Sequence, residues 1–390
     1  MPFHITIHKS FSGISQRKPK ELIRVGFDDQ IFIAQSRGGI SKYFVEIIQR
    51  LPKYGVEPIL LCEETRNSHL AESGLVPRAK QDSNLKSRLR GYLWRLTGNP
   101  RYKGPLIETV DVIHHTFTNG AYLGLGHKPS VVTIYDMIPE VYPEYFPTGN
   151  PHFAKKKFAQ KCDVLISISE STTNDMLKFY GDNLRSKTMV VPFGVGEQFL
   201  SPHPEVEMPE LPEKYLLFVG VRRGYKHFKT AFLAFEQMAK KDPELCFVVI
   251  GGGRYSDEER KMVQTSPFVE RVFHFNPSDE QMPEFYRRAK CFVFPSVYEG
   301  FGLPTLESLA SGTPVVLADA SCSREVGGDL AIYCEPGDVQ SLIDSVEKAT
   351  SIDWMNRIKR DGPARAKEFT WDFVAEETAK IYKNLVQKTK

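Results

Sequence analysis

Long apolar runs are missing from this chain of 390 residues. No uncharged apolar stretch approaches the roughly 20 residues that a helix needs to span a bilayer. Residues 1–20 contain no apolar core of the length that a secretory signal requires. We therefore expect a protein that is neither secreted through a visible signal nor held in a membrane by a spanning helix.

Cysteine pairs and net charge are also scarce. The six cysteines include no C-x-x-C pair, which argues against a zinc site and against a dithiol motif. Several lie in apolar runs, as in residues 290–294, so we expect buried reduced thiols and a cytoplasmic protein. A formal net charge of +3, from 51 basic and 48 acidic residues, gives no support for nucleic-acid binding.

Strand and helix patterns alternate along the chain. Short runs of Val, Ile, Leu and Phe between turn residues are typical of strands that are buried on both faces of a parallel sheet. Helical patterns between them imply right-handed crossovers. We expect strands near 22–27, 58–62, 110–115, 130–135, 163–168 and 188–192, and again near 215–219, 246–250, 271–275, 290–294, 314–317 and 330–334.

The length of the chain exceeds what one hydrophobic core usually supports. Residues 201–212 contain four prolines among polar residues and therefore indicate a linker. We predict an α/β protein with two Rossmann-like, doubly wound domains, at 1–200 and 201–370, that face a cleft. Residues 371–390 have a helical pattern, and this helix either closes the second domain or crosses back to the first.

The most informative segment is 294–312. It starts at the end of an expected strand, and Gly300 and Gly302 permit a tight loop whose backbone can approach a ligand. Pro304 suits the first turn of a helix. That helix would direct unpaired N–H groups and a partial positive charge into the loop, where a diphosphate is the natural ligand.

Glu299 and Glu307 flank this loop, eight positions apart. Carboxylates accept hydrogen bonds from sugar and ribose hydroxyls, so one strand, loop and helix could hold both parts of a nucleotide sugar. In the alternative interpretation, Glu307 only favours the start of the helix and Glu299 is a solvated loop acid.

Residues 299–307, with the sequence EGFGLPTLE, closely resemble the E-x7-E segment of retaining glycosyltransferases of the GT-B fold, glycosyltransferase family 4. The resemblance covers nearly the whole chain from about Arg24 onward. It implies that Glu307 binds the donor ribose and that Glu299 lies beside the transferred sugar. It also implies a donor site that includes Gly300, Phe301, Gly302 and Leu303.

A second matching segment, 218–228, follows the first strand of the second domain. In the family an Arg and a Lys here stabilise the departing diphosphate, which corresponds to Arg222 and Lys226. A basic pair in a glycine-containing turn can neutralise such a leaving group. Arg223 is a possible substitute for Arg222, and a solvated basic turn is the plainer alternative. His227 stands where the family usually has Asn.

A third match is the glycine pair Gly38 and Gly39, between the first strand and a helix with apolar residues at helical spacing. Family members of this kind place the glycine loop close to the donor phosphates or the acceptor. Glycines 251–253 resemble a phosphate-binding turn, and we interpret them mainly as a structural turn near the nucleotide base.

The chain departs from the family at Tyr135, where many relatives have a histidine before an aspartate. A phenol is a poor base near neutral pH. Retaining transfer of this class is thought to use leaving-group assistance and front-face attack, so a side-chain base is not required. Asp136 remains a candidate for a catalytic contact with the sugar or acceptor. Tyr135 and His115 are candidates for acceptor contacts, and a satisfied core histidine is the alternative for His114 and His115.

The segment 78–103 carries eight basic residues and one acid, Asp82, with apolar residues at helical spacing. A basic amphipathic helix of this kind can lie on an anionic membrane. An ordinary helix packed on the core with a solvated basic face is equally compatible with the pattern. Lysines 155–157 would extend the same surface.

These observations predict a retaining transferase that moves a hexose, with mannose favoured, from a nucleoside diphosphate to a hydroxyl of a glycan or a polyprenyl-linked glycan. Surface polysaccharide or O-antigen biosynthesis and a GDP-linked donor are the expected setting. We expect no metal and no further cofactor. The alternatives are a nucleotide-sugar epimerase or a phosphorylase on the same fold, and a catalytically inactive nucleotide-sugar-binding protein, suggested by Tyr135.

Overall fold

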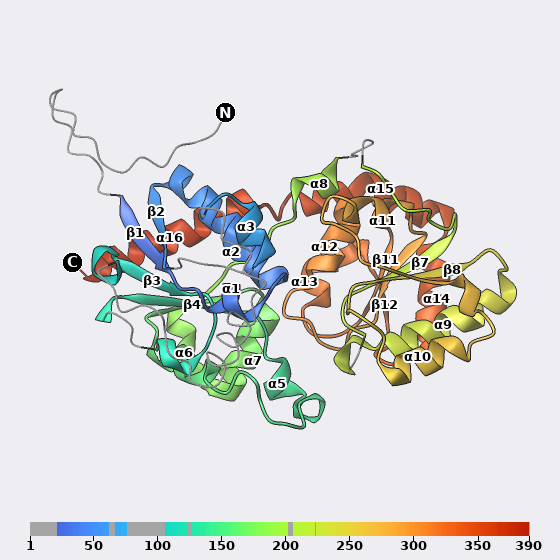
Figure 1. Ribbon diagram of the computed structural model, residues 1–390, viewed down its shortest axis with the longest axis horizontal. Helices are drawn as coiled ribbons and strands as arrows, with labels where there is room; N and C mark the ends of the chain where they lie inside the picture. Colours follow the sequence, from blue (N-terminus) through green and yellow to red (C-terminus); the bar gives the residue numbers. More distant parts are fainter. Residues whose placement is uncertain are drawn as a thin grey trace, which may run out of the picture.

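The computed structural model describes residues 22–61, 67–75, 106–123, 127–201, 206–222 and 224–389. These residues form two units side by side, each built on a parallel six-stranded sheet (Figure 1). The fold class predicted from the sequence is therefore confirmed. The segment 78–103, with its predicted membrane surface, lies outside the described residues, as do Arg223 and Cys62.

The first sheet has the strand order β2-β1-β3-β4-β5-β6, and the second has the order β12-β11-β10-β7-β8-β9. Each predicted strand is present, with ends that differ by at most two residues. The strands of the first sheet are β1 (Ile23–Phe27), β2 (Val56–Leu60), β3 (Val112–His115), β4 (Ser130–Ile134), β5 (Val164–Ser167) and β6 (Thr188–Val190). Those of the second are β7 (Tyr215–Val219), β8 (Cys246–Ile250), β9 (Val272–Phe275), β10 (Cys291–Phe294), β11 (Val315–Ala318) and β12 (Ile332–Cys334).

Helices cover both sheets, as expected for crossover connections. The first unit includes α1 (Gln30–Ala34), α2 (Gly39–Arg50), η1 (Leu51–Tyr54), α3 (Ser68–Glu72), α5 (Ile138–Val141), α6 (Lys155–Lys161) and α7 (Glu170–Tyr180). The short helix α8 (Glu197–Leu200) follows and contacts the second unit. The second includes η7 (Gly224–Lys226), α9 (Phe228–Lys241), α10 (Asp257–Gln264), α11 (Met282–Arg288), α12 (Leu303–Ala310), α13 (Ser323–Gly327), α14 (Val339–Ala349) and α15 (Ile352–Ala366).

The core follows from the apolar runs in the sequence. All residues of β3, β10 and β11 are buried, because helices pack on both faces of each sheet. On α2, Phe44, Ile47 and Ile48 recur at helical spacing and are buried against the first sheet. Each such side chain contributes about 1.5–3 kcal/mol when it leaves water. The five cysteines of the described part are unpaired, and four of them are buried.

The chain passes between the units twice. Val195, on the way out, forms a parallel bridge with Thr370 on the way back, and its N–H donates to the Phe369 carbonyl at 2.8 Å. A Cβ on Gly194 would lie 2.5 Å from the Trp371 backbone nitrogen, so only glycine permits this approach. The last helix, α16 (Trp371–Thr389), then packs against α2 and β1 of the first unit (Figure 1).

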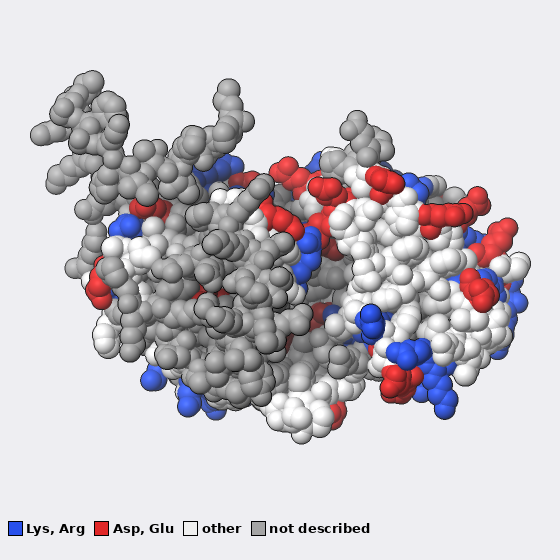
Figure 2. All heavy atoms as spheres, viewed as in Figure 1, with Lys and Arg blue, Asp and Glu red and all other residues white. Residues whose placement is uncertain are grey.

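The face of the second unit that Figure 2 shows has no strong separation of charge. In the view of Figure 2, acidic and basic side chains are interspersed there, and grey atoms cover much of the first unit. In the described part of the chain, no helix is both long enough and apolar enough to cross a membrane.

Candidate active site

The E-x7-E segment connects β10 to α12. Gly302 has φ +87°, a left-handed conformation that favours glycine, and it stands directly before the first residue of α12. Pro304 lies in the first turn, and no side chain caps that turn. The first N–H groups of α12 therefore face the loop at the carboxyl end of β10, which suits a phosphate group.

Glu299 and Lys226 meet at this end of the second sheet. Lys226 lies in η7, just after β7, and its Nζ forms an ion pair with Oε1 of Glu299. The two side chains are 13% and 17% exposed, so solvent screens the pair only partly. The Lys226 Nζ also lies 4.9 Å from the centroid of the Phe294 ring. The structure thus places a fixed cation beside the first glutamate of the motif.

Glu307 occupies a different environment. It is half-buried on α12, and the Tyr286 hydroxyl on α11 donates to its Oε2 at 3.1 Å. Desolvation raises the pKa of Glu307 to about 7, and the nearby charge of Lys42 opposes this rise. Glu299 is thus paired with a cation, whereas Glu307 changes charge near neutral pH.

Arg222 does not join Lys226 in this structure. Its guanidinium donates to the carbonyls of residues 251–253, with 2.9 Å to Gly253, and lies 3.3 Å from Glu259 Oε2. It also stacks 4.4 Å from the Tyr255 ring centroid. The Arg222 side chain is only 1% exposed, and its hydrogen bonds stabilise the glycine turn after β8. The joint action of Arg222 and Lys226 on a leaving group stays a prediction.

The glycine pair lies at the start of α2. Gly38 precedes the helix, and its carbonyl accepts from the Ser41 hydroxyl at 2.9 Å. A Cβ at Gly39 would meet no atom within 4 Å, so there is open space beside this residue. The geometry leaves room for a ligand group next to the first helical turn of the first unit.

Gly300 joins the two units. A Cβ there would lie 1.8 Å from the Tyr135 carbonyl oxygen, so a glycine is required for this approach. The Gly300 carbonyl accepts from the Ser169 hydroxyl at 2.6 Å and from the Thr172 hydroxyl at 3.2 Å. Phe301 is buried, with the ring of Phe193 at 5.6 Å. Both residues therefore form part of the contact between the units.

Asp136 follows β4 and is held by a buried lysine. Lys155 Nζ donates to the Asp136 carbonyl at 2.8 Å and lies 3.6 Å from Oδ1, and it also pairs with Glu140 at 3.0 Å. Lys155 is 5% exposed, so the prediction that it extends a basic surface is wrong for this residue, whereas the next two lysines are exposed. The lysine run gave no sign of this role, because the partners of Lys155 lie 15 and 19 positions earlier in the chain.

Tyr135 and the two histidines are buried. The Tyr135 ring lies 6.1 Å from that of Tyr43, and burial raises the pKa of the Tyr135 hydroxyl well above its usual range. His115 Nδ1 lies 2.9 Å from the buried Asp28 carboxylate. His114 contacts Tyr382 and Thr133 through its two nitrogens, and burial lowers its pKa to about 3. His114 is thus the satisfied core histidine of the plainer interpretation.

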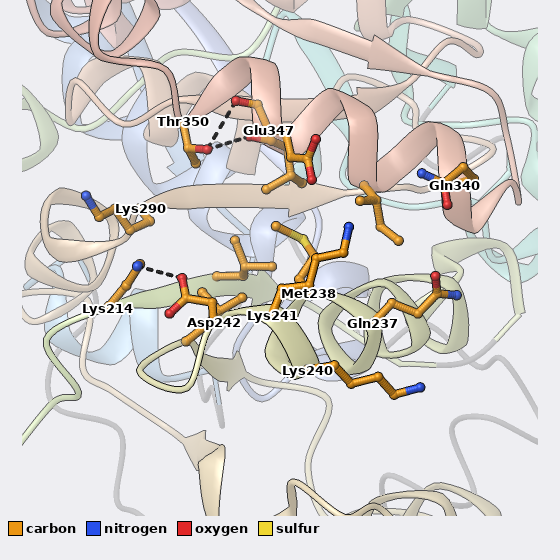
Figure 3. Close-up of a pocket in the computed structure, with 14 residues that line it drawn as sticks. Lys214, Gln237, Met238, Lys240, Lys241, Asp242, Lys290, Gln340, Glu347 and Thr350 are labelled. Carbon is orange, nitrogen blue, oxygen red and sulfur yellow. Dashed lines mark hydrogen bonds and ion pairs between the residues drawn. The ribbon is translucent and has the colours of Figure 1, made fainter.

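A cavity of about 660 Å³ lies elsewhere, between α9 and α14 (Figure 3). Lys214 and Lys290, which line it, precede β7 and β10, so it opens at the amino ends of these strands. Figure 3 shows the ion pair between Lys214 and Asp242 at its edge. The predicted donor residues lie at the opposite, carboxyl ends, where ligands of parallel sheets bind. This cavity is therefore not the candidate active site.

Solved structures with the same architecture define the class of protein. Sucrose-phosphate synthase from Thermosynechococcus elongatus superposes with a TM-score of 0.71 and 18% identity, over 94% of this chain and 100% of that one. Anabaena Alr3699/HepE, solved with UDP and glucose, superposes with a TM-score of 0.69 and 16% identity, over 91% and 98%. The two facing sheets are the GT-B fold of glycosyltransferases.

Family comparisons make the assignment specific. Residues 37–199 match Glycosyltransferase Family 4, and residues 203–363 match Glycosyl transferases group 1. The chain belongs to glycosyltransferase family 4 and is therefore an enzyme that transfers glycosyl groups.

Two bacterial relatives match along most of their length. O-antigen chain mannosyltransferase B of Escherichia coli is 24% identical over 89% of this chain and 96% of the relative. O-antigen chain mannosyltransferase RfbU of Salmonella typhimurium is 23% identical over 81% of this chain and 89% of the relative.

Proposed function

We propose that this enzyme transfers mannose or a related hexose from a GDP-linked donor to a hydroxyl of a glycan or a lipid-linked glycan. The transfer retains the configuration of the sugar. The setting would be surface-polysaccharide or O-antigen synthesis on the cytoplasmic side of the cell membrane. The observation that best supports glycosyl transfer is the ion pair between Lys226 and Glu299, at the start of the E-x7-E segment. The two O-antigen mannosyltransferases that match over most of the chain support the choice of sugar.

In this proposal the unit at 201–370 binds the donor, and the unit at 1–200 binds the acceptor. Lys226 exchanges its contact with Glu299 for the departing diphosphate, while the N–H groups at the start of α12 bind the phosphates. Glu299 then supports the sugar, and the ionised Glu307 accepts hydrogen bonds from the ribose. Arg222 acts through the shape of the glycine turn at 251–253, and Asp136 faces the acceptor.

A UDP-linked sugar is the second candidate donor, because the matching Alr3699/HepE structure was solved with UDP and glucose. Calorimetry and thermal shifts with GDP, UDP and their hexose conjugates would separate the two. We expect one nucleotide family to stabilise the protein by about 2.7 kcal/mol at a hundredfold excess over Kd. If no nucleotide binds in several buffers, the donor site is not where we place it.

Turnover then distinguishes the classes of enzyme. A transferase releases free nucleoside diphosphate in proportion to a glycan acceptor, whereas an epimerase interconverts the donor without one. Binding without turnover across a broad set of acceptors would instead indicate an inactive nucleotide-sugar-binding protein.

Nucleotide affinity is expected to depend on pH through Glu307. With a pKa of about 7, its ionised fraction rises about tenfold between pH 6 and pH 8. Since the ionised carboxylate is the better acceptor for ribose hydroxyls, Kd should fall by up to about tenfold over this range. Calorimetry of Glu307→Gln is the control, because this variant keeps any pH effect of the nucleotide itself. An identical pH profile in both proteins would rule out Glu307 as the titrating group.

A further inference from the structure

Asp279 of the second unit receives three basic side chains from the first unit. It lies in the loop between β9 and α11, and its Oδ1 is 2.9 Å from Arg37 Nη2. Its Oδ2 lies 3.3 Å from His69 Nε2, off the direction of a well-formed hydrogen bond, and 3.8 Å from Lys42 Nζ. His69, with Lys42 and Arg37, holds the pKa of Asp279 well below its usual range. Asp279 is therefore a carboxylate at neutral pH.

The three basic side chains come from the elements around the glycine pair. Arg37 directly precedes Gly38, Lys42 lies in α2, and His69 lies in α3. Lys42 and His69 have side chains that are 16% and 9% exposed, so both are largely shielded from solvent. A single carboxylate thus draws three segments of the first unit toward the second.

The charge of Lys42 also acts on the second glutamate of the E-x7-E segment. Its Nζ lies 5.9 Å from the ring centroid of Phe199, which is itself 5.9 Å from the ring of Tyr286. The Tyr286 hydroxyl donates to Glu307. Lys42, Tyr286 and Asp279 are the described groups whose charge or hydrogen bonding acts on Glu307, and of these Lys42 favours its ionised form most.

Several other contacts between the units do not pair opposite charges. The Gly300 carbonyl is held by hydroxyls of Ser169 and Thr172, and the Glu325 carboxylate accepts from the backbone N–H of Glu170 at 2.8 Å. These bonds involve backbone groups on one side. At Asp279, in contrast, charged side chains from both units meet, so a single substitution removes the attraction.

We propose that Asp279 is a positioning residue that draws the two units together at the glycine pair and holds the Lys42 ammonium where its charge acts on the Glu307 carboxylate. Its effect on the donor site rests on the proposed function, since Glu307 matters there as a ribose ligand. Its effect on how closely the two units approach each other does not rest on the proposed function.

Solution scattering of the ligand-free full chain tests the first part. Asp279→Asn removes the charge at constant size, and we expect a larger radius of gyration than in the wild type. The matched control is Asp329→Asn, which breaks a pair with Arg357 at 2.5 Å inside the second unit and should leave the scattering unchanged. Circular dichroism and thermal melting establish that each variant is folded. Equal scattering of Asp279→Asn and the wild type would overturn the role in closure.

The pH profile of nucleotide affinity tests the second part, with GDP or UDP as the probe. Lys42→Met should move the midpoint upward by about one pH unit, because the nearby cation no longer favours the ionised Glu307. Lys42→Arg should keep the wild-type midpoint. In the Asp279→Asn background, Lys42→Met should shift the midpoint much less, since Lys42 is no longer held in place.

Two results would overturn this part. Affinity that falls equally at every pH in Lys42→Met would mean that Lys42 contacts the nucleotide directly. An undiminished shift in the Asp279→Asn background would mean that Asp279 does not position Lys42. If the wild type binds no nucleotide at any pH, the proposed function fails, whereas the scattering comparison still decides whether Asp279 draws the units together.

Discussion

Replacing Lys226 by alanine is expected to lower kcat by about 10²–10³, the usual effect of removing one group that stabilises charge in the transition state. Negative charge develops on the diphosphate as the bond to the sugar breaks, and Lys226 is the cation nearest to Glu299 at that end of the sheet. Initial rates of nucleoside diphosphate release, at saturating donor and acceptor, measure the effect. The loss should exceed any change in donor Kd, because the charge is largest in the transition state.

A lysine remote from the site provides the control. Lys240 lines the cavity between α9 and α14, at the opposite end of the second sheet, and Lys240→Ala should retain wild-type kcat. A second comparison uses Glu299→Ala, since Lys226 and Glu299 contact each other and their effects should not add. Wild-type kcat in Lys226→Ala would show that another group stabilises the leaving diphosphate.

Replacing Gly300 by alanine is expected to disturb the contact between the units. The new Cβ would lie 1.8 Å from the Tyr135 carbonyl oxygen, a distance that neither backbone can tolerate without moving. We expect a loss of about 1–3 kcal/mol in the free energy of unfolding, the usual cost of overpacking. Activity should fall as well, because the shift displaces the loop that carries Glu299 away from the hydroxyls of Ser169 and Thr172.

Urea unfolding and initial rates would measure the two effects of Gly300→Ala. Gly120→Ala is a suitable control, because a Cβ there would meet Ala154 Cβ at an ordinary 3.5 Å. This control should change stability by less than about 1 kcal/mol. If Gly300→Ala is as stable and active as the control, the loop is not held against Tyr135 in solution.

The strands and the E-x7-E loop could be predicted from sequence because their signals are local. Apolar runs of three to five residues define the strands, and Gly302 and Pro304 mark the start of α12 within three positions. The resemblance to family 4 supplied the roles of Glu299 and Glu307, which residue types alone left open.

The partners of the charged side chains could not be predicted, because they come from distant parts of the chain. Arg222 is held by carbonyls 29 to 31 positions away, and His114 contacts a hydroxyl 268 positions away. Asp279 depends on residues of the other unit. A lysine in a basic run is expected to be solvated. Only the packing of α6 shows that Lys155 is buried and paired with Asp136.

The return of the chain to its first unit has a consequence for how the protein is made. Tyr382 of α16 is fully buried and bonds to His114, and Val374 and Ala379 belong to the same core. The second unit is therefore an insertion within the first. A ribosome synthesises α16 after both sheets. Part of the apolar face of the first sheet therefore stays uncovered while the inserted unit can fold on its own. Removing α16 would thus damage the unit whose sheet is synthesised before the inserted one.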